Sequence, residues 1–189
     1  MEARPLTPSD FHRPEVLLSG TVDQVMYAEF RRQLDASSEE GLCVIELSTL
    51  GGDPEVARLM GEDVRFHSDL KPGRRFIFLG KAAIYSAGTT FMSFFARANR
   101  YLTRGTRLMI HERLMASTLP INGPLTTCVA AVEAKLNEIR ASIAIQDEGF
   151  DNLVRGSQVS LDEVRERATS NWYIEASEAQ ALGLIEGVL

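Results

Sequence analysis

The amino-acid sequence predicts an α/β domain built around a parallel sheet. In its first half, short apolar runs alternate three times with stretches of helical apolar spacing, and successive βα units of this kind form parallel sheets. The length of 189 residues fits a single domain with a sizeable core. Hydrophobic residues make up 44% of the chain and charged residues 24%, which is typical of a folded globular protein and excludes wholesale disorder.

The first two βα units are predicted within the first 70 residues. An apolar run over residues 15–20 is closed by glycine and indicates a strand, and residues 22–34 carry apolar side chains at helical spacing. A second apolar run over 43–47 predicts the next strand. Asp53 and the proline after it suit the cap and the first position of a helix over 54–68.

The third unit combines a strand over 75–79 with a helix over 86–98, whose small and apolar residues indicate burial on most faces. Two further strands, over 100–103 and 107–110, flank a short turn that contains glycine. We expect these two strands to pair with each other. The second of them leads directly to His111.

The rest of the chain is predicted to be mainly helical. Residues 115–124, which include two prolines and a glycine, form a loop, and a long helix follows over 125–155. Its apolar residues recur at heptad-like spacing: Val129, Val132, Leu136, Ile139, Ile143, Phe150 and Leu153. Shorter elements complete the chain: a helix capped by Ser160 that ends at residue 168, a strand over 172–174 and a helical turn over 177–182.

Charge and cysteine content exclude several classes of function. The chain has 20 Lys and Arg residues against 26 Asp and Glu, a net charge of -6 that repels nucleic acid and anionic lipid. Cys43 and Cys128 form no zinc-binding or disulfide pattern, and the sequence offers no candidate site for a metal or an organic cofactor. We find neither a signal peptide in residues 1–14 nor an apolar run long enough to span a membrane. We therefore expect a cytoplasmic protein with no nucleic-acid or membrane partner.

Ser86 is the first candidate for chemistry. It lies between a buried strand and the start of a helix, among residues small enough for a substrate backbone to approach closely. The N-terminus of that helix presents unpaired N–H groups and a partial positive charge, which stabilise a developing oxyanion. A serine at this position is a candidate nucleophile, although capping of the helix would also explain it.

A nucleophilic serine needs a base, and His111 is the best of the three histidines. Its strand would carry the imidazole to the edge of the sheet, beside other residues borne on loops. His12 lies in the proline-rich N-terminal segment, and His67 lies near the end of a helix, where interaction with the helix dipole explains it better. A structural role for His111 remains the alternative.

Gly51 and Gly52 follow the second strand, where ligands gather in open α/β sheets. A backbone N–H at this place could donate to an oxyanion, and a tight turn before the helix would explain the glycines equally well. The spacing fits neither a dinucleotide-binding nor a phosphate-binding glycine motif, so nucleotide binding is not expected.

In order along the chain, these segments resemble the ClpP family of serine peptidases. The resemblance spans about residues 15–187, and His111 follows Ser86 by 25 residues. The residues around the serine differ from the family's more usual Ala-Ser-Met-Gly, which indicates a divergent ClpP-like member rather than the housekeeping peptidase. The segments that carry the resemblance are VLLSG at 16–20, LSTLGG at 47–52, GKAAIYSAG at 80–88, LMIH at 108–111 and EAQALGLI at 178–185.

The resemblance implies a role for each site residue. Ser86 would be the nucleophile and His111 the general base, and the N–H groups of Gly51 and Ala87 would form the oxyanion hole. The position of the family's acidic triad member falls on Asn171. An asparagine can accept the Nδ1–H of the histidine but cannot stabilise the imidazolium by charge, so reduced activity is expected. Glu175 and Glu112 are the other residues that could orient the ring.

The resemblance also implies a fold and an assembly. The fold would be a ClpP/crotonase-like spiral of βα units, with residues 125–155 as a long handle helix, within a single peptidase domain over 15–189. Residues 1–14 would be a flexible leader. The heptad-like face of the handle would pack between subunits of a homo-oligomeric ring, or alternatively would cover the sheet of its own subunit. An AAA+ unfoldase partner is possible in this family, but the sequence does not establish one.

Three functions follow from these observations. The first is a serine endopeptidase that cleaves unfolded polypeptides or short peptides through an acyl-enzyme on Ser86. The second, motivated by Asn171, is a non-catalytic ClpP-like subunit that assembles with or regulates others. The third is an acyl-CoA enzyme of the crotonase type, which would share the fold and the backbone oxyanion donors without needing Ser86 and His111 together.

Overall fold

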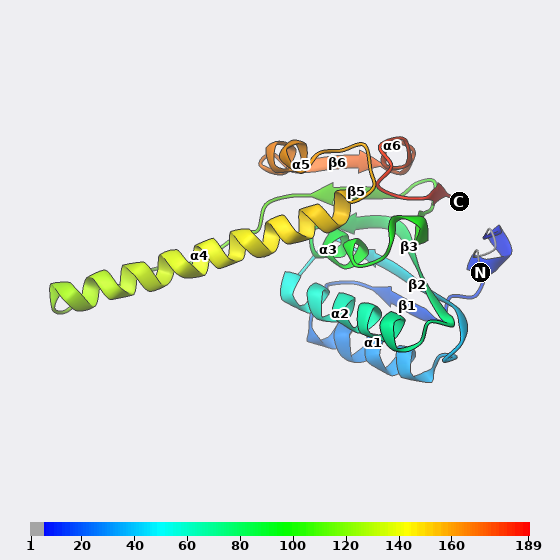
Figure 1. Cartoon of the computed structure of the whole chain (residues 1–189), viewed down its shortest axis with the longest axis horizontal. Helices are drawn as coiled ribbons and strands as arrows, with labels where there is room; N and C mark the ends of the chain where they lie inside the picture. The colour runs from blue at the N-terminus through cyan, green and yellow to red at the C-terminus, as the bar shows by residue number, and fades with distance from the viewer. Residues whose placement is uncertain (1–5) are drawn as a thin grey trace.

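A mostly parallel sheet of seven strands organises the chain (Figure 1). The computed structural model describes residues 6–189. Five strands follow the order β1-β2-β3-β4-β7, while β5 pairs with β3 and β6 with β5. Only β5 and β6 run antiparallel among these pairs, so the predicted α/β class is confirmed. The strands are β1 (Val16–Ser19), β2 (Gly41–Thr49), β3 (Arg74–Tyr85), β4 (Arg100–Leu102), β5 (Arg107–Ile110), β6 (Trp172–Glu175) and β7 (Gly187–Val188).

The helices begin where the sequence places capping residues. Asp53 accepts the N–H groups of Glu55 and Val56, and Ser160 accepts that of Glu163, as predicted. The helices are α1 (Gln24–Ala36), α2 (Pro54–Leu70), α3 (Ala87–Ser93), α4 (Leu125–Val154), α5 (Leu161–Ala168) and α6 (Ala176–Ala181), with 3₁₀ turns η1 (Pro8–Phe11) and η2 (Arg97–Asn99).

The predicted pairing of β4 with β5 is wrong. Both strands run parallel to β3 and pair with it one after the other, β4 at residues 78–80 and β5 at residues 83–85. β3 is long enough for this because it continues past the predicted strand end, through Ala82 at a positive φ of 59°. The extension carries the chain to Ser86 and brings β5 to the same edge of the sheet.

The main core lies between the sheet and helices α1, α2 and α3, with Phe30, Phe78 and Phe91 among its fully buried side chains. A smaller cluster occupies other residues of β2 and β3 and includes Phe11 from η1. Phe11 is 8% exposed, and its ring lies 4.9 Å from that of Tyr101. Part of the expected leader therefore packs on the domain, whereas residues 1–5 lie outside the described residues.

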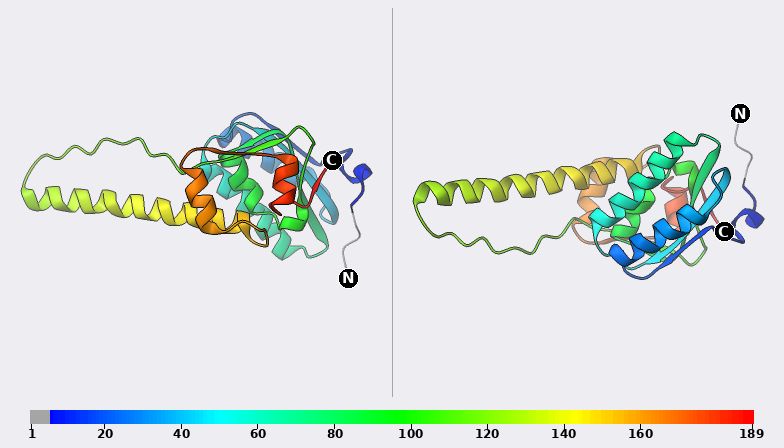
Figure 2. Two further views of the ribbon diagram at one scale, coloured as in Figure 1. Left: turned by 90° about the horizontal axis from the view of Figure 1, so that it is seen from above. Right: turned by 90° about the horizontal axis from the view of Figure 1, so that it is seen from below.

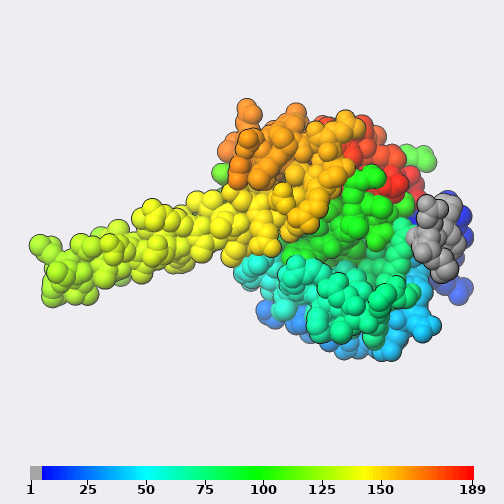
Figure 3. All heavy atoms as spheres, viewed as in Figure 1, coloured from blue at the N-terminus to red at the C-terminus, as the bar shows by residue number. Residues whose placement is uncertain are grey.

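Helix α4 projects from the body of the molecule as a rod (Figures 1 and 3). Its 30 residues span roughly 45 Å at 1.5 Å per residue, and only Phe150, Leu153 and Val154 near its C-terminal end are buried. Residues 111–124 form no regular secondary structure and run beside the helix (Figure 2). Of the heptad-like face, Phe150 and Leu153 pack into the core of their own subunit. The other five side chains are 40–56% exposed, so the alternative that the face covers its own sheet is wrong for them: Val129, Val132, Leu136, Ile139 and Ile143.

Among residues 6–189, no helix has the length and apolar character needed to cross a bilayer.

Candidate active site

The backbone holds Ser86 in an unusual conformation. Its φ of 53° and ψ of -112° place it at a sharp turn between β3 and α3. The Ser86 N–H donates to the carbonyl of Met109 on β5, at 2.8 Å. Its carbonyl accepts the N–H groups of Thr89 and Thr90 and the Thr89 hydroxyl, at 2.9, 3.2 and 2.7 Å. These bonds offset a conformation that is costly for a residue with a side chain, and they fix where Oγ points.

Gly51 lies directly against the serine. A Cβ on Gly51 would stand 2.9 Å from the Cβ of Ser86, and its φ of +118° also favours glycine. The hydroxyl of buried Thr49 accepts the Gly51 N–H at 3.0 Å and donates to the Gly51 carbonyl at 3.1 Å. The end of β2 therefore forms one wall of the site, and Thr49 fixes its backbone.

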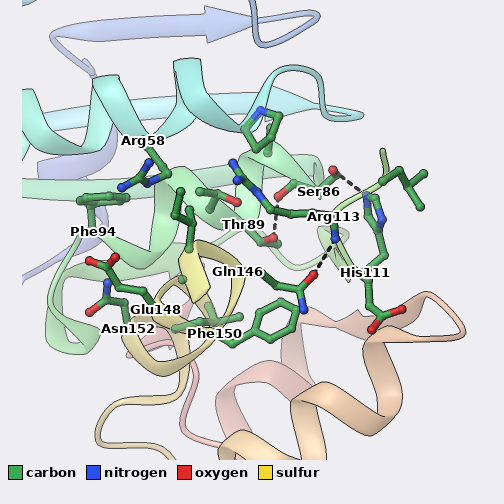
Figure 4. A pocket seen from close by; sticks show the side chains of 18 of the residues that line it. Arg58, Ser86, Thr89, Phe94, His111, Arg113, Gln146, Glu148, Phe150 and Asn152 are labelled. Atoms are coloured by element: carbon green, nitrogen blue, oxygen red, sulfur yellow. Dashed lines mark hydrogen bonds between the residues drawn. The ribbon is translucent and has the colours of Figure 1, made fainter. Parts of the chain in front are cut away.

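His111 lies opposite the serine, at the end of β5. Its Nε2 is 2.7 Å from Ser86 Oγ (Figure 4). Ile110 before it is buried and pairs with Trp172, and Glu112 after it donates its N–H to Ala168 at 3.3 Å. The structure thus brings the predicted nucleophile and the predicted base into hydrogen-bond contact.

The backbone donors beside Ser86 differ in part from the expected pair. Ala87 is the first residue of α3, and the described residues provide no acceptor for its N–H. The N–H of Gly51 already donates to Thr49, so this residue does not fit the predicted role of a free donor. The next residue, Gly52, is exposed and lines the pocket at Ser86, and no acceptor for its N–H exists within residues 6–189. Gly52 and Ala87 are the two pocket-lining residues beside Ser86 whose N–H groups have no acceptor within residues 6–189.

Asn171 lies near His111 along the sheet but does not hold its ring. It precedes Trp172, whose partner on β5 is the residue before His111. Its side chain is exposed, and its φ of 58° is one that asparagine tolerates. No hydrogen bond from the part of the chain that the structure describes reaches Nδ1 of His111. The structure thus shows no contact by which Asn171 orients the ring, and the role expected of this residue stays a prediction.

The two alternative orienting residues lie differently. Glu175 is at the far end of β6 and forms an ion pair with Arg107 at 3.0 Å. This position is remote from His111 along the strand. Glu112 adjoins the histidine, is exposed and lines the pocket.

The pocket at Ser86 has a cavity volume of about 220 Å³, below the roughly 300–1,000 Å³ of sites for drug-sized ligands. Figure 4 shows Ser86 and His111 on one side, with Arg58, Phe94 and Glu148 farther along. Its apolar lining includes Phe94, Leu114, Ile145, Phe150 and Leu153. This volume and lining suit one side chain of a larger substrate.

Arg100 fixes the far ends of two helices that border this pocket. The residue is 2% exposed and has no carboxylate partner within residues 6–189. Burial lowers the pKa of Arg100 to about 10, so it remains charged at neutral pH, and the negative dipole ends of α3 and α4 stabilise the charge. Its guanidinium donates to the carbonyl oxygens of Ser93, Phe95, Asn152, Leu153 and Leu184.

Sequence reasoning missed several residues of the site. Thr49 and Arg100 carry no local signal, because their roles depend on backbone groups that folding brings to them. Arg113 also lines the pocket, and it lies in a short charged and apolar stretch directly after His111. Comparison of the chain with models of known protein families finds none that matches.

Proposed function

We propose that this chain is a serine peptidase that hydrolyses unfolded polypeptides or short peptides through an acyl-enzyme on Ser86. The observation that carries the proposal is the 2.7 Å contact between Ser86 Oγ and His111 Nε2, on a serine in a strained turn at a helix N-terminus. Capping alone does not account for it, because the Ser86 side chain forms no cap hydrogen bond with α3. The resemblance to ClpP-like peptidases supports a peptide substrate.

The reaction follows from this arrangement. Ser86 Oγ attacks the scissile carbonyl carbon while His111 Nε2 takes the hydroxyl proton. The N–H groups of Gly52 and Ala87 donate to the oxyanion that forms on the carbonyl oxygen. The C–N bond then breaks, and the amine leaves with the proton from Nε2. Water, deprotonated by the same imidazole, hydrolyses the ester and releases the acid and Ser86.

We extend the proposal to a homo-oligomeric ring in which the outer part of the exposed α4 face, at Val129, Val132 and Leu136, packs between subunits. An apolar stripe of this length on a projecting helix is unusual for a monomer, and burying it against a second copy would remove it from water. Light scattering should give a particle of several chains at micromolar concentration. A particle with the mass of one chain would contradict the ring.

Active-site labelling tests the peptidase proposal. Intact-mass spectrometry after treatment with a fluorophosphonate should show one adduct, which Ser86→Ala and His111→Ala both abolish. Ser93→Ala is the matched control, since Ser93 is a buried serine at the other end of α3 and should leave labelling unchanged. An adduct that persists in Ser86→Ala would contradict the assignment of the nucleophile.

A non-catalytic subunit is the second candidate, and it is favoured by the Nδ1 of His111, which has no hydrogen-bond partner within residues 6–189. Without an acceptor at Nδ1, nothing selects the tautomer in which Nε2 can take a proton. This candidate predicts a folded oligomer with no adduct on Ser86. The labelling experiment therefore decides between the two.

A further inference from the structure

A second pocket adjoins the one that holds Ser86. It lies between the start of α2, the segment after His111 and the middle of α4. Its apolar lining comes from Leu114, Met115, Ile139 and Ile143, which are 87, 44, 40 and 51% exposed. Four residues line both pockets: Pro54, Arg113, Leu114 and Gln146. The two pockets are therefore neighbouring parts of one groove.

Arg113 forms the partition between them. Its N–H donates to Gln146 Oε1 on α4 at 2.7 Å (Figure 4), and its guanidinium reaches Glu55 on α2 at 2.5 Å. The other oxygen of Glu55 accepts from Arg58 at 2.7 Å. Burial raises the pKa of Glu55, but the hydrogen bonds from Arg113 and Arg58 outweigh it, so the pKa lies below its usual value. Glu55 is thus ionised at neutral pH, and Arg113 spans the groove from one helix to the other.

The partition adjoins both halves of the candidate catalytic apparatus. Arg113 is two residues after His111, and Glu55 is three residues after the backbone donor Gly52. An extended peptide advances about 3.3 Å per residue, with successive side chains on opposite sides. A polypeptide acylating Ser86 can therefore place one side chain in the first pocket and a later one beyond Arg113.

We propose that the second pocket is a subsite for an apolar side chain of the polypeptide substrate, remote from the scissile bond. The inference rests on the proposed function. It adds a preference for substrates with an apolar side chain at this position, which Ser86 and His111 alone do not impose. A substrate segment is the occupant because the pocket is continuous with the cavity at Ser86. The apolar face of α4 beyond it, at Val129 and Val132, lines neither pocket.

Peptidyl phosphonates test the subsite: Ser86 Oγ displaces the leaving group from phosphorus to form a phosphonyl ester, while the peptide part lies where a substrate would. The probes are a one-residue phosphonate and two four-residue phosphonates, which carry leucine or aspartate at the position farthest from phosphorus. In the native protein, the leucine probe should react about five- to tenfold faster than the aspartate probe. Ile143→Asp should bring this ratio to within about twofold. Val129→Asp changes a similarly exposed side chain of the same helix outside both pockets and should preserve the ratio.

The one-residue probe separates the two proposals. It should label Ser86 at the same rate in all three proteins, because it ends before Arg113. If it labels Ser86 while the leucine and aspartate probes react equally in the native protein, the subsite is overturned and the peptidase proposal stands. If both variants lose the preference for the leucine probe, and light scattering shows that their oligomers have dissociated, Ile143 is assigned to contacts between copies and the subsite is also overturned. Absence of labelling by every probe would overturn both proposals.

Discussion

Ser86 and His111 are in contact, yet the fold holds them very differently. The backbone of Ser86 is bonded to β5 and within α3, and Gly51 stands against its side chain. His111 follows β5, and the next residue, Glu112, donates its N–H to the carbonyl of Ala168 at the end of α5, but within residues 6–189 the only hydrogen bond of the ring is the one with Ser86. The position of Ser86 is therefore determined by packing and backbone hydrogen bonds. The orientation of the His111 ring depends on its single contact with Ser86 Oγ, which is lost if either side chain rotates.

This difference predicts where substitutions act most strongly. Changes beside Ser86 alter rigid packing, and a displacement of about 1 Å there can lower reactivity about 100-fold. Changes near Nδ1 of His111 alter only how the ring is oriented. Reactivity toward the fluorophosphonate measures both, if Ser86 is the nucleophile.

Gly51→Ala should have the largest effect. The new Cβ would lie 2.9 Å from the Cβ of Ser86, so the serine must move, and labelling should fall about 100-fold. Gly41→Ala is the matched control, because Gly41 also has a positive φ, of +81°, but nothing lies within 4 Å of its added Cβ. Both variants should lose about 1–2 kcal/mol of stability from backbone strain, measured by chemical denaturation. Equal labelling in the two variants would show that the packing of Gly51 on Ser86 is unimportant.

Thr49→Val should have an intermediate effect. The substitution keeps the side-chain shape but removes the hydroxyl that bonds both backbone groups of Gly51. The freed Gly51 N–H should loosen this wall of the site, and labelling should fall about tenfold. Thr106→Val is the control: Thr106 is another buried threonine, and its hydroxyl donates to the carbonyl of Gly80. Similar losses of stability with a loss of labelling only in Thr49→Val would support the local role, and unchanged labelling in Thr49→Val would contradict it.

The sequence predicts well what depends on neighbours along the chain. The alternation of strands and helices, the caps at Asp53 and Ser160, and the meeting of Ser86 with His111 at one sheet edge follow from local patterns and from parallel topology. The extent of β3 was not predictable in this way. The stretch between Gly80 and Tyr85 contains an alanine at positive φ, which local propensity disfavours, and its strand pairings are made with β5 and, at Ile84, with Thr49 of β2.

The sequence fails where a role depends on a distant partner. Gly51 and Gly52 are indistinguishable as a glycine pair in the sequence, whereas in the fold Gly51 packs against Ser86 and its N–H donates to the Thr49 hydroxyl. The ion pair of Arg113 with Glu55 joins segments 58 residues apart. Charge along the chain gives no sign of such a pairing, because it is made by the packing of α2 beside the segment that follows His111.

Asn171→Asp should have the smallest effect, in the opposite direction. A carboxylate near the outer face of His111 would favour the imidazolium that forms during attack and the tautomer that accepts the serine proton. The site is exposed, so solvent screens the charge, and labelling should rise by only about three- to tenfold. Asn171→Ala should leave labelling within about twofold, because the Asn171 side chain forms no hydrogen bond with His111 among the described residues. A large loss in Asn171→Ala would show that the asparagine already orients the ring during reaction, whereas no gain in Asn171→Asp would leave Glu112 as the acidic residue best placed to do so.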